Sequence, residues 1–330
     1  MLTIRGRELL PLVQGGMGVG ISAHRLAGAV AREGCVGTIA SVDLRRHHPD
    51  LMRATGRSRD RQAIEAANLV ALDRELRAAR ELAAGNGAIA VNVMRAVSQY
   101  PGYVRQACAS GADAIVVGAG LPFDLPELTA DYPQVALIPI LSEARAIGLV
   151  LRKWQRKGRL PDAIVIEHPR YAGGHLGAAK IDEVGDRRFD FAEVLPAAAR
   201  LFEELRIAPI PLIVAGGINS PERVNEALAL GAAGVQVGTP FAVTVESDAH
   251  ANFKRVLAGA GAAAIVTFMS VAGLPARAVR TPWLARYLEK EAVLQRRAKQ
   301  RRECTLAFDC LAQCGLRDGN ARIGQFCIDH

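Results

Sequence analysis

The 330-residue sequence has few aromatic residues, no long apolar run and no clear leader segment. Only 5% of its residues are aromatic although half are hydrophobic, and such small and branched residues suit parallel strands covered by helices. No apolar run reaches the roughly 20 residues of a membrane helix. Residues 1–7 lack the apolar core of a signal peptide, so we expect a cytoplasmic protein with no membrane partner.

The sequence has an excess of positive charge, +8, much of it in residues 45–61 and 290–302. A basic balance permits nucleic acid or other anionic partners. However, no aromatic residues interleave with these arginines, as a platform for stacking bases requires. We therefore interpret both stretches as solvated faces and expect no nucleic-acid partner.

The sequence also lacks closely spaced cysteine pairs. Its six cysteines are expected to be thiols in the cytoplasm. Four of them cluster near the C-terminus: Cys304, Cys310, Cys314 and Cys327. Clustered thiols can bind zinc or an iron–sulfur centre, but these spacings lack the tight C-x2-C pairs typical of such sites. We predict packed or surface thiols and no metal, with a metal-binding or partner-docking tail as the alternative.

Apolar runs typical of strands recur along the chain with helical patterns between them. The predicted strands are 9–14, 36–41, 88–94, 114–120, 135–141, 163–167, 211–218 and 234–239. Ser22, Ser142 and Ser220 are candidate helix N-caps. Near-continuous apolar strands that alternate with helices predict an α/β fold, a (β/α)8 TIM barrel, with a doubly wound sheet as the alternative.

The prediction includes two additions to this barrel. A basic insert follows the second strand, and a helical, cysteine-containing extension follows the barrel. We place the barrel at residues 1–282 and the extension at 283–330. Arg277, Arg280 and Trp283 lie near this boundary, in a segment that could close over a bound ligand.

Small, polar and flexible residues follow the predicted strands, where the active site of a TIM barrel forms. They are Gln14 to Met17, Asn92, Gly118 to Gly120, Gly173 to His175, Ala215 to Gly217, and Gly238 with Thr239. Such a surface suits a large, flat, neutral ring held by backbone groups. Loops after the last two strands of these barrels often hold a phosphate, which Gly216, Gly217, Gly238 and Thr239 fit.

A glycine-rich loop after the sixth predicted strand carries His175. Histidine titrates near neutral pH and can move protons, whereas a histidine in a surface loop can also be merely solvated. Its position at a strand end favours a catalytic role. Glu167, which ends that strand, could orient the loop by hydrogen bonding, and Tyr171 could line the pocket.

Five segments of the chain resemble the FMN-dependent nitronate monooxygenases, formerly called 2-nitropropane dioxygenases. The segments are PLVQGGM at 11–17, VNVM at 91–94, AGGHLG at 172–177, AGGI at 215–218 and VQVGT at 235–239. The resemblance runs in order from about residue 9 to 282. Flavin-dependent enoyl-ACP reductases and some NADH:quinone reductases share much of this motif set, so the resemblance indicates fold and cofactor better than substrate.

The resemblance implies an FMN site and a substrate-facing histidine. Gly16 and Met17 would lie against the flavin ring, Asn92 near the flavin or its phosphoryl tail, Ala119 and Gly120 along the pocket, Gly174 on the cofactor, and Gly216, Gly217, Gly238 and Thr239 at the phosphate. His175 would face the substrate. Pro240 departs from relatives with a basic residue there, and Ser142 and Glu143 from relatives with a lysine or another polar flavin contact.

The reaction implied is oxidation of an alkyl nitronate or nitroalkane by O₂ to a carbonyl compound and nitrite. His175 would act as a base or hold the anionic nitronate. The alternative is an NAD(P)H-dependent reductase of enoyl thioesters or quinones, with the nucleotide phosphate or an acyl carrier on the insert at 45–61. The partners expected are a small-molecule substrate with O₂, or NAD(P)H. Whether the chain forms a homodimer is left open.

Overall fold

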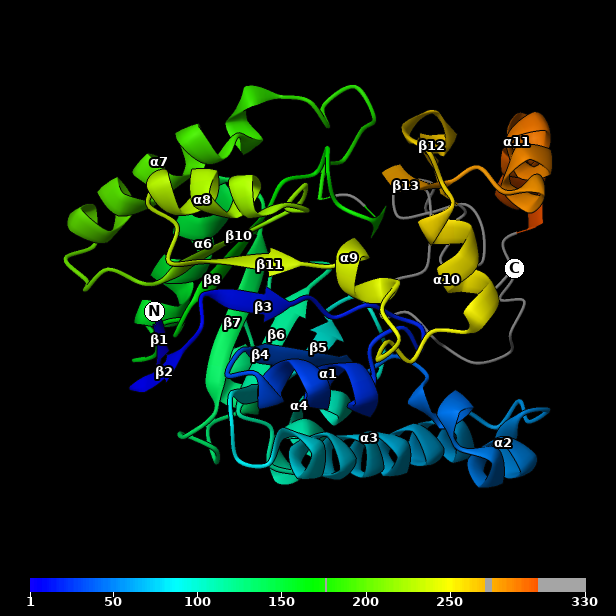
Figure 1. Ribbon diagram of the computed structural model, residues 1–330, viewed down its shortest axis with the longest axis horizontal. Helices are drawn as coiled ribbons and strands as arrows, with labels where there is room; N and C mark the ends of the chain where they lie inside the picture. The colour runs from blue at the N-terminus through cyan, green and yellow to red at the C-terminus, as the bar shows by residue number, and fades with distance from the viewer. Residues whose placement is uncertain (176, 271–274, 302–330) are drawn as a thin grey trace.

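Eight parallel strands form a closed barrel. The structure is a computed structural model that describes residues 1–175, 177–270 and 275–301. The barrel order is β10-β11-β3-β4-β5-β6-β7-β8 (Figure 1). The strands are β3 (Leu12–Gln14), β4 (Val36–Ala40), β5 (Ala88–Met94), β6 (Ala114–Gly118), β7 (Ala136–Leu141), β8 (Ile164–Glu167), β10 (Leu212–Ala215) and β11 (Gly234–Val237). Closure confirms the predicted TIM barrel and excludes the open, doubly wound sheet.

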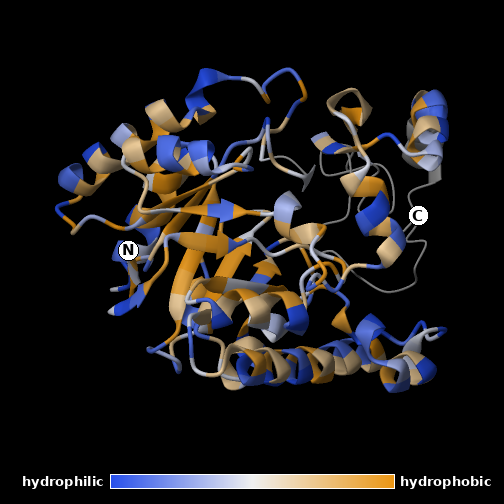
Figure 2. Cartoon of the chain, in the orientation of Figure 1, coloured by the Kyte–Doolittle hydropathy of each residue, from blue (hydrophilic) through white to orange (hydrophobic). Residues whose placement is uncertain are grey.

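Helices cover the outside of the barrel. They are α1 (His24–Arg32), α3 (Arg61–Ala83), α4 (Tyr100–Ala109), α5 (Leu125–Leu128), α6 (Ala144–Gln155), α7 (Phe191–Glu204), α8 (Pro221–Ala229) and α9 (Thr239–Ala242). Figure 2 shows apolar residues concentrated on the strands and polar residues on the helices. This distribution follows from parallel strands that are covered on both faces.

Successive residues of each strand alternate between two apolar cores. Val13, Val36, Val116, Val165 and Ile213 belong to a cluster inside the barrel. The residues between them pack outward against the helices in a second, larger cluster. The alternation follows from the two-residue period of a strand, and it decides which side chains at the strand ends face the mouth of the barrel.

A hairpin that the sequence analysis missed precedes the barrel. β1 (Leu2–Ile4) pairs with β2 (Arg7–Leu9), and Leu2 and Leu9 pack against the barrel interior. The prediction of one strand over residues 9–14 was wrong because Pro11 separates β2 from β3, and proline has no N–H for a sheet ladder. In Figure 1 the hairpin lies at the end of the barrel opposite the strand arrowheads.

Two of the three predicted helix caps are wrong. Ser22 accepts a hydrogen bond from Met17 N at 2.9 Å instead of capping α1. The Asp248 carboxylate, distant in sequence, accepts hydrogen bonds from Ala23 N at 2.8 Å and Leu26 N at 3.2 Å at that helix end. Asp248 therefore performs the role that the sequence assigned to Ser22.

Of the other two predicted caps, one is wrong and one is confirmed. Ser142 does not cap α6, which begins after Glu143 with no side-chain cap. Ser220 accepts a hydrogen bond from Arg223 N at 3.4 Å, with Pro221 at the first helical position of α8, as predicted. Ser220 lies directly beside its helix in sequence, so local pattern was sufficient to find it.

The remaining elements lie on the carboxyl side of the barrel. The predicted basic insert follows the second barrel strand, and it forms η1 (Leu44–His47) and α2 (Pro49–Thr55), which the sequence analysis did not specify. A small antiparallel sheet has the order β12-β13-β9, formed by β12 (Ile265–Met269), β13 (Pro275–Val279) and β9 (Gly174–His175). The other elements are η2 (Arg187–Phe189), α10 (Ala251–Ala258), η3 (Ala262–Ala264) and α11 (Pro282–Arg301). In Figure 1 the β3 and β11 arrows point toward the side of β12, β13, α10 and α11.

Both cysteines of the described barrel, Cys35 and Cys108, are buried thiols, as expected. Cys304, Cys310, Cys314 and Cys327 lie outside the described residues. The division into a barrel at 1–282 and an extension at 283–330 stays a prediction.

Candidate active site

The ends of β3 and β5 meet at one edge of the barrel mouth. A Cβ atom on Gly16 would lie 2.3 Å from Asn92 Cβ, so only glycine fits there. Gln14 is fully buried, and its Oε1 accepts a hydrogen bond from Thr38 N at 2.9 Å. This bond ties the end of β3 to β4. Gly16 and Asn92, predicted separately, are therefore brought into contact.

The end of β11 lies beside the same loop. Gly15 N donates to Val237 O at 2.9 Å, and the nearest atom to a Cβ built on Gly238 would be Met17 Sδ, at 3.7 Å. Thr239, at the exposed start of α9, follows directly. Within the described ranges, no backbone acceptor pairs with the N–H of Gly238 or Thr239. Unpaired donors at a helix start are suited to an anion.

The end of β10 packs on the loop after β8. Gly216 and Gly217 have φ of +102° and +77°, which few other residues adopt. Cβ atoms there would lie 3.0 Å from His168 O and 3.1 Å from Tyr171 Cγ. Among the described residues the N–H of Gly217 likewise has no backbone acceptor, whereas the parallel register of Ala215 with Gln236 directs the N–H of Gly216 toward Gln236 O. Three of the four backbone donors predicted for the phosphate therefore have no backbone acceptor in the described ranges, at the ends of two adjacent strands.

His168 anchors the loop that carries His175. It is buried, its Nδ1 accepts from Arg170 N at 3.2 Å, and its Nε2 lies 3.1 Å from Asp190 Oδ1. Because Nδ1 is an acceptor, the proton belongs on Nε2, which donates to Asp190. The ring also lies against Tyr171, with centroids 4.9 Å apart. His168 is therefore a structural residue rather than a free catalytic group.

Arg95, which directly follows β5, lies beside the end of β6 at the mouth. Ala119 and Gly120 have φ of +56° and +129°. The Arg95 side chain lies beside Gly120, where a Cβ would be 3.2 Å from Arg95 Cγ. Arg95 pairs with Asp124 at 3.1 Å and lies over the Tyr100 ring. The sequence analysis missed Arg95, although its position just after β5 could have indicated it.

The His175 segment is held by a strand that comes about 100 residues later. β13 pairs with β9, so that Ala276 lies opposite His175 and Arg277 opposite Gly174. Arg277 Nη1 also donates to Tyr171 O at 3.2 Å. The weakly indicated segment around Arg277 thus lies against the glycine-rich loop. The His175 side chain lies outside the described part of the structure, and its catalytic role stays a prediction.

Glu167 ends β8 beside this loop. Burial raises the pKa of its carboxyl group to about 7. Its backbone lies opposite Ala215 in the register with β10, next to Gly216. A carboxyl group with a pKa near neutral at the end of a barrel strand is a candidate for proton exchange.

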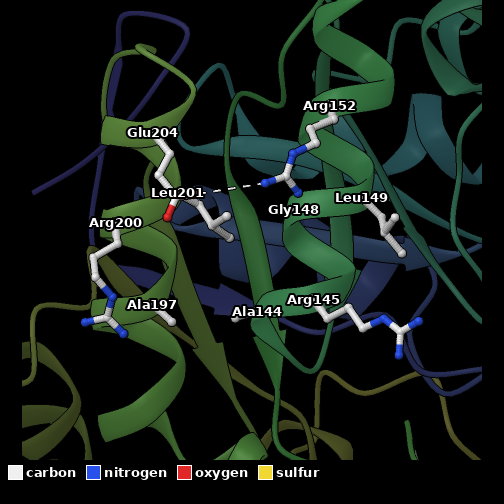
Figure 3. Close-up of a pocket in the computed structure, with 9 residues that line it drawn as sticks. All are labelled: Ala144, Arg145, Gly148, Leu149, Arg152, Ala197, Arg200, Leu201 and Glu204. Atoms are coloured by element: carbon white, nitrogen blue, oxygen red, sulfur yellow. Dashed lines mark ion pairs between the residues drawn. The ribbon is translucent and has the colours of Figure 1, made fainter.

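A groove in the described residues lies elsewhere, on the outside of the barrel between α6 and α7. It has a volume of about 330 Å³ and includes Arg145, Arg152, Arg200 and Glu204 in its lining. Figure 3 shows that Arg145 and Arg200 point to opposite sides, while Arg152 pairs with Glu204 at 3.8 Å. The arginines do not converge on one point, so we place the active site at the strand ends.

Comparison with known proteins decides the family. A family model described as nitronate monooxygenase matches residues 7–324. The chain belongs to the nitronate monooxygenase family. It is therefore a flavin-dependent oxidoreductase. None of the helices in the described ranges is long and apolar enough to cross a membrane.

Individual relatives agree with the assignment to the nitronate monooxygenase family. A probable nitronate monooxygenase of Bacillus subtilis is 27% identical over 83% of this chain and 77% of its own. Nitroalkane oxidase from Streptomyces ansochromogenes has a TM-score of 0.65 at 17% identity, over 97% of this chain and 89% of that chain. FabK from Thermotoga maritima has a TM-score of 0.64 at 23% identity, over 96% of this chain and 84% of that chain. The two structural likenesses show the shared fold.

Proposed function

We propose that this chain binds FMN at the barrel mouth and oxidises alkyl nitronates or nitroalkanes with O₂ to a carbonyl compound and nitrite. Family membership supports the reaction class. The observation that carries the cofactor assignment is the set of unpaired backbone donors at the ends of β10 and β11. Donors on two adjacent strands suit the phosphate of a mononucleotide such as FMN.

The phosphate would be held by Gly216, Gly217, Gly238 and Thr239. Pro240 follows and contributes neither a charge nor an N–H. Backbone dipoles and the Thr239 hydroxyl would then supply the stabilisation that a basic residue supplies elsewhere. The ring would lie across the mouth, against the group Gly16, Met17, Asn92, Ala119, Gly120 and Gly174. Their small size and polarity support close approach of a flat ligand.

FMN supplies the electron transfer when bound, and the chain binds, orients and moves protons. His175 would take the proton from the carbon next to a neutral nitro group, or donate a hydrogen bond to an anionic nitronate. The pairing of β9 with β13 supports this role, because it fixes the backbone that carries the imidazole.

Spectroscopy and turnover test this proposal. The purified protein should be yellow with bound FMN, and an alkyl nitronate alone should bleach the flavin anaerobically. His175→Ala should keep FMN and lose at least about a hundredfold in turnover, the range of general acid–base catalysis. The control is His250→Ala, a change at an exposed residue directly before α10. A protein that cannot take up FMN, or unchanged turnover of His175→Ala, contradicts the proposal.

The NAD(P)H-dependent reductase is the second candidate. Arg53, Arg57 and Arg59 of the basic insert are exposed and could meet a nucleotide phosphate. Arg45 cannot, because it is buried and its Nη1 donates to Thr55 Oγ1 at 2.9 Å. Rapid anaerobic bleaching by NADH or NADPH, with none by a nitronate, would favour the reductase.

A further inference from the structure

Glu167 points into the barrel. Along β8, Ile164 and Ile166 pack in the outer core, while Val165 packs in the barrel interior. The two-residue period of a strand places Glu167 on the same inward face as Val165. Since Glu167 is the last residue of β8, its carboxyl group lies at the top of the interior, beneath the mouth.

The strand neighbours of Glu167 on the inward face are apolar. Its strand partner on β10 is Ala215, and Ile140 on β7 lies opposite Val165 one inward position below. Within the part of the chain that the structure describes, Glu167 has no hydrogen-bond or ion-pair partner. Burial alone raises the pKa of Glu167 to about 7.

The nearby charged groups are engaged elsewhere. His168 lies on the opposite face of the chain and pairs with Asp190. Glu143, after β7, pairs with Arg188 at 3.5 Å. β10 carries no titratable side chain between Leu212 and Ala215. Nothing described therefore favours the charged form, and the neutral acid is the form expected below about pH 7.

A largely buried carboxyl group without a partner is costly, and proteins normally supply one. Glu167 is partly exposed, and its inward-facing position at the end of β8 opens on the mouth, where a bound ligand can supply the partner that the described residues do not. We propose that Glu167 contacts the flavin from inside the barrel: its neutral carboxyl group donates a hydrogen bond to an acceptor atom of the flavin ring. This inference rests on the proposed function, because it takes FMN as the ligand.

The proposal predicts how FMN affinity depends on pH. When Glu167 loses its proton, it loses the donor and places a negative charge beneath an anionic cofactor. Affinity should therefore fall as pH rises through about 7. Glu167→Gln keeps an N–H donor but cannot titrate, whereas Glu167→Leu removes the donor.

The test measures the FMN dissociation constant of the flavin-free protein by quenching of flavin fluorescence, from pH 6 to pH 9. We expect the wild-type constant to rise about tenfold more than that of Glu167→Gln over this range, which corresponds to a one-unit pKa difference between free and bound states. Glu167→Leu should bind about tenfold more weakly than wild type at pH 6. Glu203→Gln, an exposed position on α7, is the control.

The phosphate of FMN titrates in every variant, so the difference between the profiles isolates Glu167. Parallel profiles for wild type and Glu167→Gln, or unchanged binding by Glu167→Leu, overturn this inference and leave the proposed function standing. Absence of FMN binding in the wild type overturns both. If Glu167→Gln does not fold, the wild-type profile decides, because a pH-independent dissociation constant contradicts the proposal.

Discussion

Glu75 on α3 is buried and Glu167 on β8 is only partly exposed, yet the surroundings of the two acids differ. Glu75 is 1% exposed, and its Oε2 accepts from His24 N at 2.9 Å and lies 2.7 Å from His24 Nδ1. His48 Nε2 lies 2.9 Å from the other oxygen, although the two groups are not aligned for a hydrogen bond. Burial acts to raise the pKa of Glu75, but the hydrogen bonds from His24 outweigh it and the pKa is lowered. Glu167 has no such partners, and its pKa is raised.

The difference indicates two uses of a buried acid. Glu75 joins the start of α1 to α3, so its hydrogen bonds stabilise the fold. The chain can therefore satisfy a buried carboxylate fully where stability requires it. At Glu167 it does not, and the unsatisfied group faces the mouth where the cofactor is proposed to bind. Perturbed acids of this kind concentrate at functional sites.

The largest expected effect is the removal of Glu75. Glu75→Leu leaves the N–H and the imidazole of His24 without their acceptor and removes the carboxylate beside His48, and we expect a loss of about 3 kcal/mol in the free energy of unfolding. Urea denaturation at pH 7 measures it. Glu81→Leu, an exposed change on the same helix, should alter stability by less than about 0.5 kcal/mol. Equal effects of the two variants would contradict the structural role assigned to Glu75.

At Glu167 we expect removal of the charge to raise the free energy of unfolding at high pH, the opposite of the effect at Glu75. Its folded pKa of about 7 exceeds the usual 4.5, so the folded state binds the proton more tightly than the unfolded state. Stability of the flavin-free wild type therefore falls as pH rises from about 4.5 to 7, and the full shift corresponds to about 3 kcal/mol. Because the side chain retains some solvent access, we expect Glu167→Gln to be about 1 to 2 kcal/mol more stable than wild type at pH 8, and nearly equal near pH 4.5. Lower stability of Glu167→Gln at pH 8 would mean that Glu167 has a structural partner.

The two glutamates also differ in how far sequence could predict them. Apolar runs and terminal glycines predicted the barrel, and the end of β8 placed Glu167 near the site. The contacts of Glu75 could not be predicted, because His24 is 51 residues away. The same limit explains Asp248 at the start of α1 and the pairing of β13 with the His175 segment. Local patterns reveal strands and caps, whereas contacts between distant residues depend on the closed fold.

A smaller effect is expected at Arg277 on β13, which holds the glycine-rich loop that follows Glu167. Arg277→Ala removes the hydrogen bond to Tyr171 O, worth about 1 kcal/mol, and frees one edge of the glycine-rich loop. Hydrogen exchange of the amides around Gly174 should become faster while exchange in α3 stays unchanged. Arg280→Ala, exposed beyond the paired part of β13, is the matched control. Unchanged exchange around Gly174 would show that β13 does not hold the loop.

The smallest expected effect is the pH dependence of the stabilisation that the contact between His24 and Glu75 provides. The hydrogen bond to Glu75 raises the pKa of His24 above 6.5, although burial opposes it. The stabilisation from charged His24 is therefore fully present below pH 6.5 and is lost as pH rises through the raised value. His24→Gln should cost up to about 1 kcal/mol more at pH 6 than at pH 9 in urea denaturation, because a partly exposed ion pair is screened by solvent. The decisive control repeats His24→Gln in the Glu75→Leu background, where this pH dependence should disappear. If it persists there, the histidine is stabilised by another group, and Glu75 is not the centre of a satisfied cluster.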